Sequence, residues 1–190
     1  DEEALEAVID KRVSLVPTFT FLANLIDFGD KVGSDPALQN IFRSEIAQSS
    51  VMIRRAYEAG VPLMCGSESG FSLTPYGDWH YREMELFVDH LGLTPLEAIM
   101  CATEAGAGIF GLQSELGRIE ENYIADLVLV EGDLEADINL LGQKDNIRAV
   151  FKAGQLVNTD QPLPEDWNIP GWRTGQYSSD ILTYDLAHKK

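Results

Sequence analysis

The stretch VPLMCGSES, residues 61–69, begins as a short apolar run and ends in small polar residues. It directly follows residues 36–60, where isoleucines recur at helical spacing and Gly60 provides a stop signal. Before that segment, VSLVPTFTF at residues 13–21 is rich in Val, Phe and Thr and too apolar to face water, which favours a second buried strand. A strand, a helix and a strand joined in this way are typical of a parallel sheet, so we expect an α/β fold.

Further helices are predicted around these strands. Residues 1–12 carry acidic side chains first and basic ones last, the order that the helix dipole prefers. Residues 79–90 again show helical spacing. Thr94 and Glu97 have the spacing of a capping box, which predicts a helix that starts there and runs to about Phe110.

The hydrophobic period changes after about Leu116. Two runs, residues 124–133 and 146–157, read as strands bounded by Gly and Asp turns. We therefore expect a boundary that separates residues 1–115 from a β-rich module at 116–157.

Residues 158–190 differ in composition from the rest of the chain. Most of the segment is rich in Pro, Gly and Trp and has no period. We expect an extended tail that lies across a surface, held by Trp167 and Trp172.

Composition excludes several kinds of partner. The chain has 190 residues, of which 45% are hydrophobic, so it can bury a core. Its formal net charge of -17 repels phosphate backbones and anionic lipid head groups, so neither nucleic acid nor membrane is expected as a partner. No apolar run of about 18 residues and no basic leader is visible, which makes a cytoplasmic location the default expectation.

The two cysteines, Cys65 and Cys101, lie in apolar surroundings without CxxC spacing. This pattern favours free thiols in the core over a disulfide framework or a metal site.

The strongest local constellation is GSESGFSLTPYGDWH, residues 66–80, where the second strand opens into a polar loop. Active sites of βα-barrels are built from loops at the carboxyl ends of strands, so a carboxylate such as Glu68 can bind a metal or move a proton there. The alternative is that Glu68 stabilises the loop by accepting backbone N–H bonds.

His80 ends this loop, just before a helix. It could contact a substrate at the mouth of a barrel, or it could simply bond to backbone at the helix start. The hydroxyls of Ser69, Thr74 and Tyr76 could line a pocket for substrate, although hydroxyls in loops usually serve turns.

Five motifs in this order resemble the C-terminal part of a metal-dependent hydrolase of the amidohydrolase superfamily, in the imidazolonepropionase-like and prolidase-like subgroup. The motifs are GVPLMCGSESG (60–70), LTPYGDWHYREMELFV (73–88), LGLTPLEAIMCAT (91–103), LGRIEENYIADLVLVEGD (116–133) and IRAVFKAGQLV (147–157). The resemblance implies a (β/α)8 TIM-like barrel, of which residues 1–115 would supply strands seven and eight with their helices. Residues 116–157 would be the C-terminal part of a composite β-sandwich.

The resemblance also implies an activity, namely hydrolysis of a C–N bond in an amide or peptide-like substrate by metal-activated water. Glu68 stands where the family has the strand-eight aspartate that binds the metal and takes a proton from water. The extra methylene moves its carboxylate outward, and a shift of this size can lower a rate greatly.

The family's other metal ligands would lie upstream of Asp1. His80, His90 and His188 are the only histidines of the sequence, and none forms an HxH or i, i+4 pair. We therefore expect a divalent metal, most simply zinc, in the complete enzyme and none stably bound by this chain alone, which would be inactive without the upstream half.

A second hypothesis of a different class is a non-catalytic domain that self-associates or binds a partner. Two barrel strands cannot close a barrel, and their unpaired edges would invite pairing. On either hypothesis we expect the partner to be an upstream half or a second copy, and the chain not to be monomeric.

Overall fold

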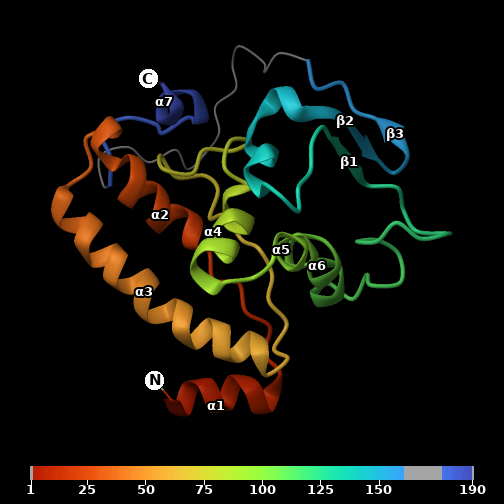
Figure 1. Ribbon diagram of the computed structural model, residues 1–190, viewed down its shortest axis with the longest axis horizontal. Coiled ribbons are helices and arrows are strands. Elements are labelled where there is room, and N and C mark those ends of the chain that lie inside the picture. The colour runs from red at the N-terminus through yellow and green to blue at the C-terminus, as the bar shows by residue number, and fades with distance from the viewer. Residues whose placement is uncertain (1, 161–176, 190) are drawn as a thin grey trace.

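The computed structural model describes residues 2–160 and 177–189. Trp167 and Trp172, which the sequence suggested as anchors of the tail, lie outside these residues. Figure 1 shows a layer of helices beside a small sheet, with the N-terminal helix at one end and the C-terminus near the opposite end. None of the described helices is both long and apolar enough to cross a bilayer.

Most of the regular secondary structure in the described residues is helical. The helices are α1 (Glu2–Lys11), α2 (Phe19–Phe28), the 3-10 helix η1 (Gly29–Val32), α3 (Pro36–Glu58), α4 (Arg82–Leu91), α5 (Pro95–Ala102), α6 (Glu104–Ile109), the 3-10 helices η2 (Ile138–Gly142) and η3 (Lys144–Asn146), and α7 (Tyr184–His188). The predicted helices at the N-terminus, at residues 36–60 and at residues 79–90 are confirmed as α1, α3 and α4.

The two predicted barrel strands meet in a short parallel pairing. The amide of Leu15 donates to the carbonyl of Pro62 at 2.9 Å, and the amide of Met64 donates to the carbonyl of Leu15 at 2.9 Å. Gly66 is required just beyond this pairing, because a Cβ there would lie 2.6 Å from Val16 Cγ1. The parallel arrangement is therefore confirmed, and the two segments stay close to each other as far as Val16 and Gly66.

A continuous strand over residues 13–21 is a wrong prediction, because α2 begins at Phe19. The first turns of α2 are buried on two sides: Phe19 and Ala23 belong to one apolar cluster, whereas Phe21 and Leu25 belong to another. An apolar run that is buried on all sides fits a core helix as well as a buried strand, and its period cannot separate the two.

A side chain from α4 caps the start of α2. Thr18 precedes the helix with a φ of 54° and makes no side-chain cap. Instead, the Glu83 carboxylate accepts hydrogen bonds from the amides of Phe19 and Thr20, each at 2.9 Å, and from Thr20 Oγ1 at 2.6 Å. Glu83 is fully buried, so these bonds satisfy helix-end amides that water cannot reach.

Two other helices are capped by side chains from their own N-termini. Asp35 caps α3 by accepting from the amide of Ala37 at 2.8 Å. Thr94 and Glu97 form the predicted capping box of α5. The single helix predicted from there to about Phe110 is instead broken at Thr103, whose φ and ψ of -121° and -84° separate α5 from α6.

Residues 127–156 contain an antiparallel sheet with the order β1 (Leu127–Val130), β2 (Ile147–Lys152) and β3 (Gln155–Leu156). Both predicted strand regions are thus confirmed, and the second one contains a hairpin. Its two turn residues, Ala153 and Gly154, have φ values of 48° and 76°, the positive values that a two-residue hairpin favours.

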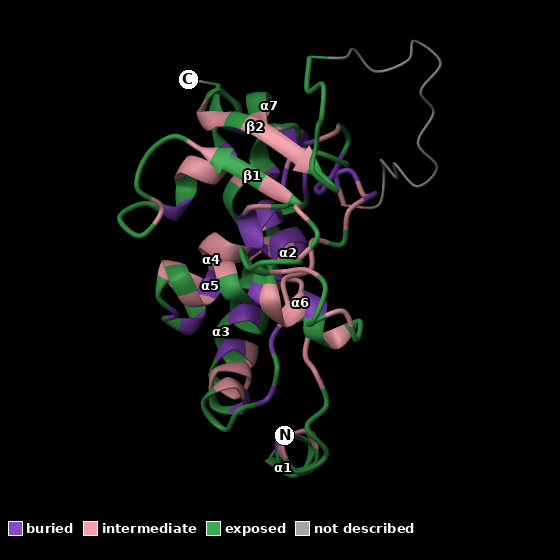
Figure 2. Ribbon diagram, turned by 90° about the vertical axis from the view of Figure 1, so that its right-hand side faces the viewer, coloured by how far each residue is buried: buried purple, intermediate pink, exposed green. Residues whose placement is uncertain are grey.

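The sheet is only partly covered. Val128 and Leu129 are neighbours on β1 and so point to opposite faces, yet they are 55% and 48% exposed. Figure 2 shows the same contrast, with buried residues concentrated on the helices and the two longer strands intermediate or exposed. The described residues form one sheet here, and its pairing into a sandwich stays a prediction.

The described end of the tail folds back onto the helices. Leu182 and Ala187 are buried there, and Tyr184–His188 forms α7. The expected extended tail therefore includes a short helix in residues 177–189.

We predict that Glu83→Ala destabilises the protein by about 1–3 kcal/mol, the usual cost of leaving buried donors without an acceptor. Urea unfolding followed by circular dichroism measures it. Glu45→Ala, at an exposed position on α3, is the matched control and should stay within about 0.5 kcal/mol of the wild type.

The difference in stability between the wild type and Glu83→Ala should depend on pH. Burial raises the pKa of Glu83 to about 7, outweighing the hydrogen bonds from Thr20 and Phe19 that lower it. Because the pKa of Glu83 is higher in the folded than in the unfolded protein, this carboxyl group contributes to the free energy of unfolding. The contribution is fully present below the unfolded pKa of about 4.3 and is lost as pH rises through about 7. The stability difference between wild type and Glu83→Ala should thus shrink from about pH 5 to about pH 8, and growth over that range would contradict the burial of this carboxyl.

Candidate functional site

The loop that follows the Leu15–Leu63 pairing is held by its own hydroxyls and glycines. Glu68 takes a φ of 50°, and its carbonyl accepts a hydrogen bond from Thr74 Oγ1 at 2.8 Å. The amide of Gly70 donates to the Thr74 carbonyl at 2.9 Å. Thr74 is buried whereas the Glu68 residue is exposed, so Thr74 shapes the loop and Glu68 stands on its outer side.

His80, at the end of the loop, lies close to Ser67 at its start. Ser67 Oγ lies 3.4 Å from His80 Nδ1, and the amide of Gly77 donates to Nε2 at 3.4 Å. Which of Ser67 Oγ and His80 Nδ1 donates depends on the tautomer of the imidazole. The backbone contact expected of a histidine at a helix start is present, together with a side-chain contact to the strand end.

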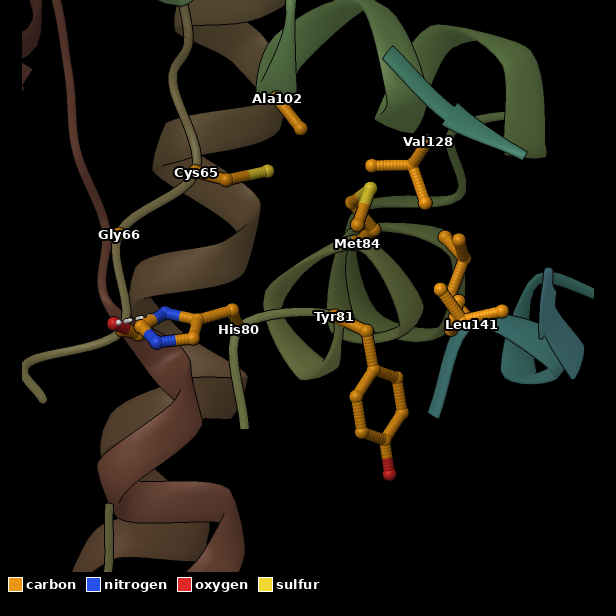
Figure 3. A pocket seen from close by; sticks show the side chains of 10 residues that line it. Cys65, Gly66, His80, Tyr81, Met84, Ala102, Val128 and Leu141 are labelled. Carbon is orange, nitrogen blue, oxygen red and sulfur yellow. Dashed lines mark hydrogen bonds between the residues drawn. The ribbon is translucent and has the colours of Figure 1, made fainter. Parts of the chain in front are cut away.

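A cavity of about 430 Å³ lies between this strand end and the small sheet. Its wall is formed by residues of the strand end, of the start of α4, of α5 and of the β-module: Cys65, Gly66, Ser67, His80, Tyr81, Met84, Ala102, Val128, Leu141 and Ile147. In Figure 3, Cys65 extends toward this space from the strand, with Met84 and Val128 on the other side. His80 and Ser67 therefore bring polar atoms to the edge of a largely apolar cavity.

Four residues proposed from the sequence do not line this cavity: Glu68, Ser69, Thr74 and Tyr76. Ser69 Oγ instead lies 2.7 Å from Ser67 Oγ. The Tyr76 ring packs over Gly70, where an added Cβ would lie 3.2 Å from the tyrosine hydroxyl. In this structure these groups serve the loop, and of the proposed residues His80 alone reaches the cavity wall.

Sequence reasoning missed Ser67, Tyr81 and Met84 as cavity residues. Ser67 could have been found from its place directly after Gly66, at the strand end where barrel sites are built. Tyr81 and Met84 could not, because their role depends on how the β-module packs onto α4. Gly142 of that module meets Tyr81 so closely that an added Cβ would lie 2.4 Å from the ring.

The side chains present do not fit a metal by themselves. In residues 2–160 and 177–189, no group of three or more His, Cys, Asp and Glu side chains is gathered closely enough to hold an ion. Glu68 stands exposed on the loop, and both ring nitrogens of His80 face protein atoms. Zinc at this site would require ligands beyond those described.

Comparison with protein families identifies the class. The model of the amidohydrolase family matches residues 9–157, and the chain belongs to this family. Ochratoxinase from Aspergillus niger is 32% identical over 102 residues, which are 53% of this chain and 20% of the ochratoxinase. Imidazolonepropionase from Rubrobacter xylanophilus is 35% identical over 74 residues, which are 39% of this chain and 18% of that enzyme.

Solved structures agree with the sequence comparison. A Xaa-Pro dipeptidase with bound methionine in its active site superposes with a TM-score of 0.65 at 28% identity, over 83% of this chain and 37% of that one. The A. niger ochratoxinase superposes with a TM-score of 0.65 at 26% identity, over 82% of this chain and 34% of that one. The resemblance inferred from the five motifs is confirmed, and the chain spans little more than a third of these structures.

We predict that the native chain reacts only slowly with a thiol reagent. Burial raises the pKa of Cys65 far above that of a free thiol and raises the pKa of Cys101 to about 11, so little of either thiol is the reactive thiolate at neutral pH. Alkylation by iodoacetamide at about pH 7.5, followed by mass spectrometry, should modify neither site until denaturant is added. Rapid labelling of Cys65 in the native protein would contradict the effect of burial on this thiol.

Proposed function

We propose that this chain is the C-terminal portion of a metal-dependent hydrolase that cleaves the C–N bond of a small amide or peptide-like substrate. Family membership and the hydrolase relatives support the reaction class. The observation that carries the proposal is the cavity at the end of the parallel pairing, with Ser67 and His80 at its edge. Barrel enzymes assemble their sites at this end of the strands.

The remainder of the site would come from an upstream half. The described segments at Leu15 and Leu63 pair only with each other, as strands seven and eight of the proposed barrel. Closure of a barrel requires the strands on either side of this pair. The match to little more than a third of each solved structure supports a longer functional protein.

Glu68 is proposed as one metal-proximal carboxylate of the complete enzyme, because the motif resemblance matches it to the family's strand-eight aspartate. A divalent metal, most simply zinc, would polarise the substrate carbonyl and activate water when bound. The chain's own contribution is substrate binding: His80 presents its imidazole at the cavity edge, and Met84 and Val128 offer apolar contact. The small cavity suits a small substrate better than a protein.

Exposed apolar side chains favour a second candidate function, that of a self-associating or partner-binding domain. Val128 and Leu129 are exposed on opposite faces of β1, and Leu156 is 67% exposed on β3. A strand edge that carries exposed apolar side chains can pair with another chain. This candidate function requires no catalysis. With it, an upstream half would add binding but no turnover.

Activity separates the two candidates. We expect no amidase or dipeptidase turnover from the chain alone and turnover after co-expression with the upstream half of its gene, because the water-activating metal needs ligands from both parts. Within the restored enzyme, Glu68→Gln should lower kcat by about 100-fold or more, the scale seen when a group acting at the reaction centre is removed. Glu121→Gln, an exposed position in the β-module, is the matched control.

Restored binding without turnover would support the partner-binding candidate instead. Turnover by the lone chain that disappears in Glu68→Gln would refute the division of the site between two halves.

Metal content is the second prediction of the proposal. The chain purified without chelators and then dialysed should contain clearly less than one zinc per chain, because Glu68 and His80 offer too few ligands for a closed shell. Elemental analysis by mass spectrometry measures it. One zinc per chain that survives dialysis would reveal a ligand set that the proposal lacks.

We also predict that the chain is not monomeric at micromolar concentration. Covering exposed apolar surface stabilises an assembly by roughly 25 cal/mol per Å², so a few hundred Å² of strand and sheet surface supply several kcal/mol. Multi-angle light scattering measures the mass, and Leu129→Lys, which adds a charge to the exposed face of β1 opposite Val128, should shift it toward one chain. A cooperatively melting monomer would contradict the expectation.

A further inference from the structure

The C-terminal residues 178–188 bind the loop that bears His80, and we call them the C-terminal clamp. Ser178 Oγ donates to Ser72 Oγ at 2.6 Å, and the amide of Leu182 donates to the Ser72 carbonyl at 2.7 Å. Ser72 and Leu182 are both fully buried. The clamp is therefore part of the core of the described chain, although more than a hundred positions separate Leu182 from Ser72 in sequence.

Two contacts of the clamp fall on the residues directly before His80. Trp79 Nε1 donates to the Leu182 carbonyl at 2.8 Å, and the indole is fully buried. The amide of Tyr184 donates to Asp78 Oδ2 at 3.0 Å. The backbone that leads into His80 is thus fixed from the clamp side by two hydrogen bonds.

His80 itself has weaker restraints. The residue is exposed, and its two ring contacts, to Ser67 Oγ and from the Gly77 amide, are both long at 3.4 Å. Bonds of this length lie beyond the usual range of protein hydrogen bonds. The position of the imidazole at the cavity edge therefore depends on the backbone of residues 78 and 79.

Asp78 also forms an ion pair, which can be compared with its hydrogen bond from Tyr184. Lys144 Nζ lies 3.4 Å from Asp78 Oδ1, and the lysine side chain is 70% exposed. The Asp78 side chain is 16% exposed, but the lysine end of the pair lies largely in water, so the pair contributes little. The bond to the Tyr184 amide is the one expected to matter, and it needs an oxygen acceptor but no charge.

We propose that Asp78 and Trp79 are positioning residues that transmit the docking of the C-terminal clamp to His80 and so hold its imidazole at the cavity edge. That the His80 imidazole held in this way contacts a substrate rests on the function proposed above. The positional claim does not, because it concerns where the ring stands and can be measured without turnover.

The test follows the imidazole resonances of the full chain by two-dimensional NMR with histidine-selective isotope labelling. Asp78→Ala should shift the His80 resonances and leave those of His90 unchanged, since His90 lies at the end of α4. Asp78→Asn should restore the wild-type His80 position because the amide oxygen can accept from Tyr184. Lys144→Ala should also leave His80 in place.

An unchanged His80 resonance in Asp78→Ala, or Asp78→Asn behaving like Asp78→Ala, would overturn the proposal. Trp79→Phe provides an independent variant in case Asp78→Ala fails to fold, because it retains an aromatic ring but removes the bond to Leu182 together with part of the buried indole. It too should shift His80 and spare His90, and a wild-type spectrum would count against the clamp. A shifted His80 together with an inactive assembled wild-type enzyme would retain the positioning and refute the proposed function.

Discussion

The buried carboxylate of Glu83 is the contact on which the arrangement of this chain depends. It ties the first turn of α4 to the first turn of α2 through three hydrogen bonds, in a region closed to water. The start of α2 fixes Thr18 against Gly66 at the strand end, and the start of α4 fixes His80 next to the same strand end. One carboxylate therefore joins the two helices whose starts flank the candidate site.

A second charged cluster supports the same helix. Arg82 pairs with Asp27 on α2 and with Glu85 one turn along α4, the latter at 2.6 Å, and its guanidinium lies 5.6 Å from the Phe28 ring. A spacing of three residues on a helix also allows a surface pair between Arg82 and Glu85, but the arginine side chain is only 9% exposed. Partial burial makes such a pair a determinant of how helices align, whereas a fully exposed one would contribute little.

Local signals made much of the fold predictable. The Thr94–Glu97 capping box predicts a helix start from contacts a few residues apart, and this prediction is confirmed. The run at residues 13–21 was misread because Glu83, 63 or more positions away, provides the helix cap that its own sequence lacks. The site followed the same rule: His80 was found from its place after a strand, whereas Tyr81 became a cavity residue only through packing of the β-module. Contacts between residues far apart in the chain leave no pattern in a short stretch of sequence from which they could be predicted.

The most direct test of this account is the hydrogen exchange of the Phe19 and Thr20 amides, measured residue by residue by NMR. Amides at the first turn of a helix normally exchange readily because they have no partner inside the helix. If Glu83 accepts from them in a water-free core, both should be protected as strongly as the interior of α2. Both should also lose that protection in Glu83→Ala, while the amide of Ala37, capped by Asp35, is unaffected. Rapid exchange of Phe19 and Thr20 in the wild-type protein would contradict the central role of this carboxylate.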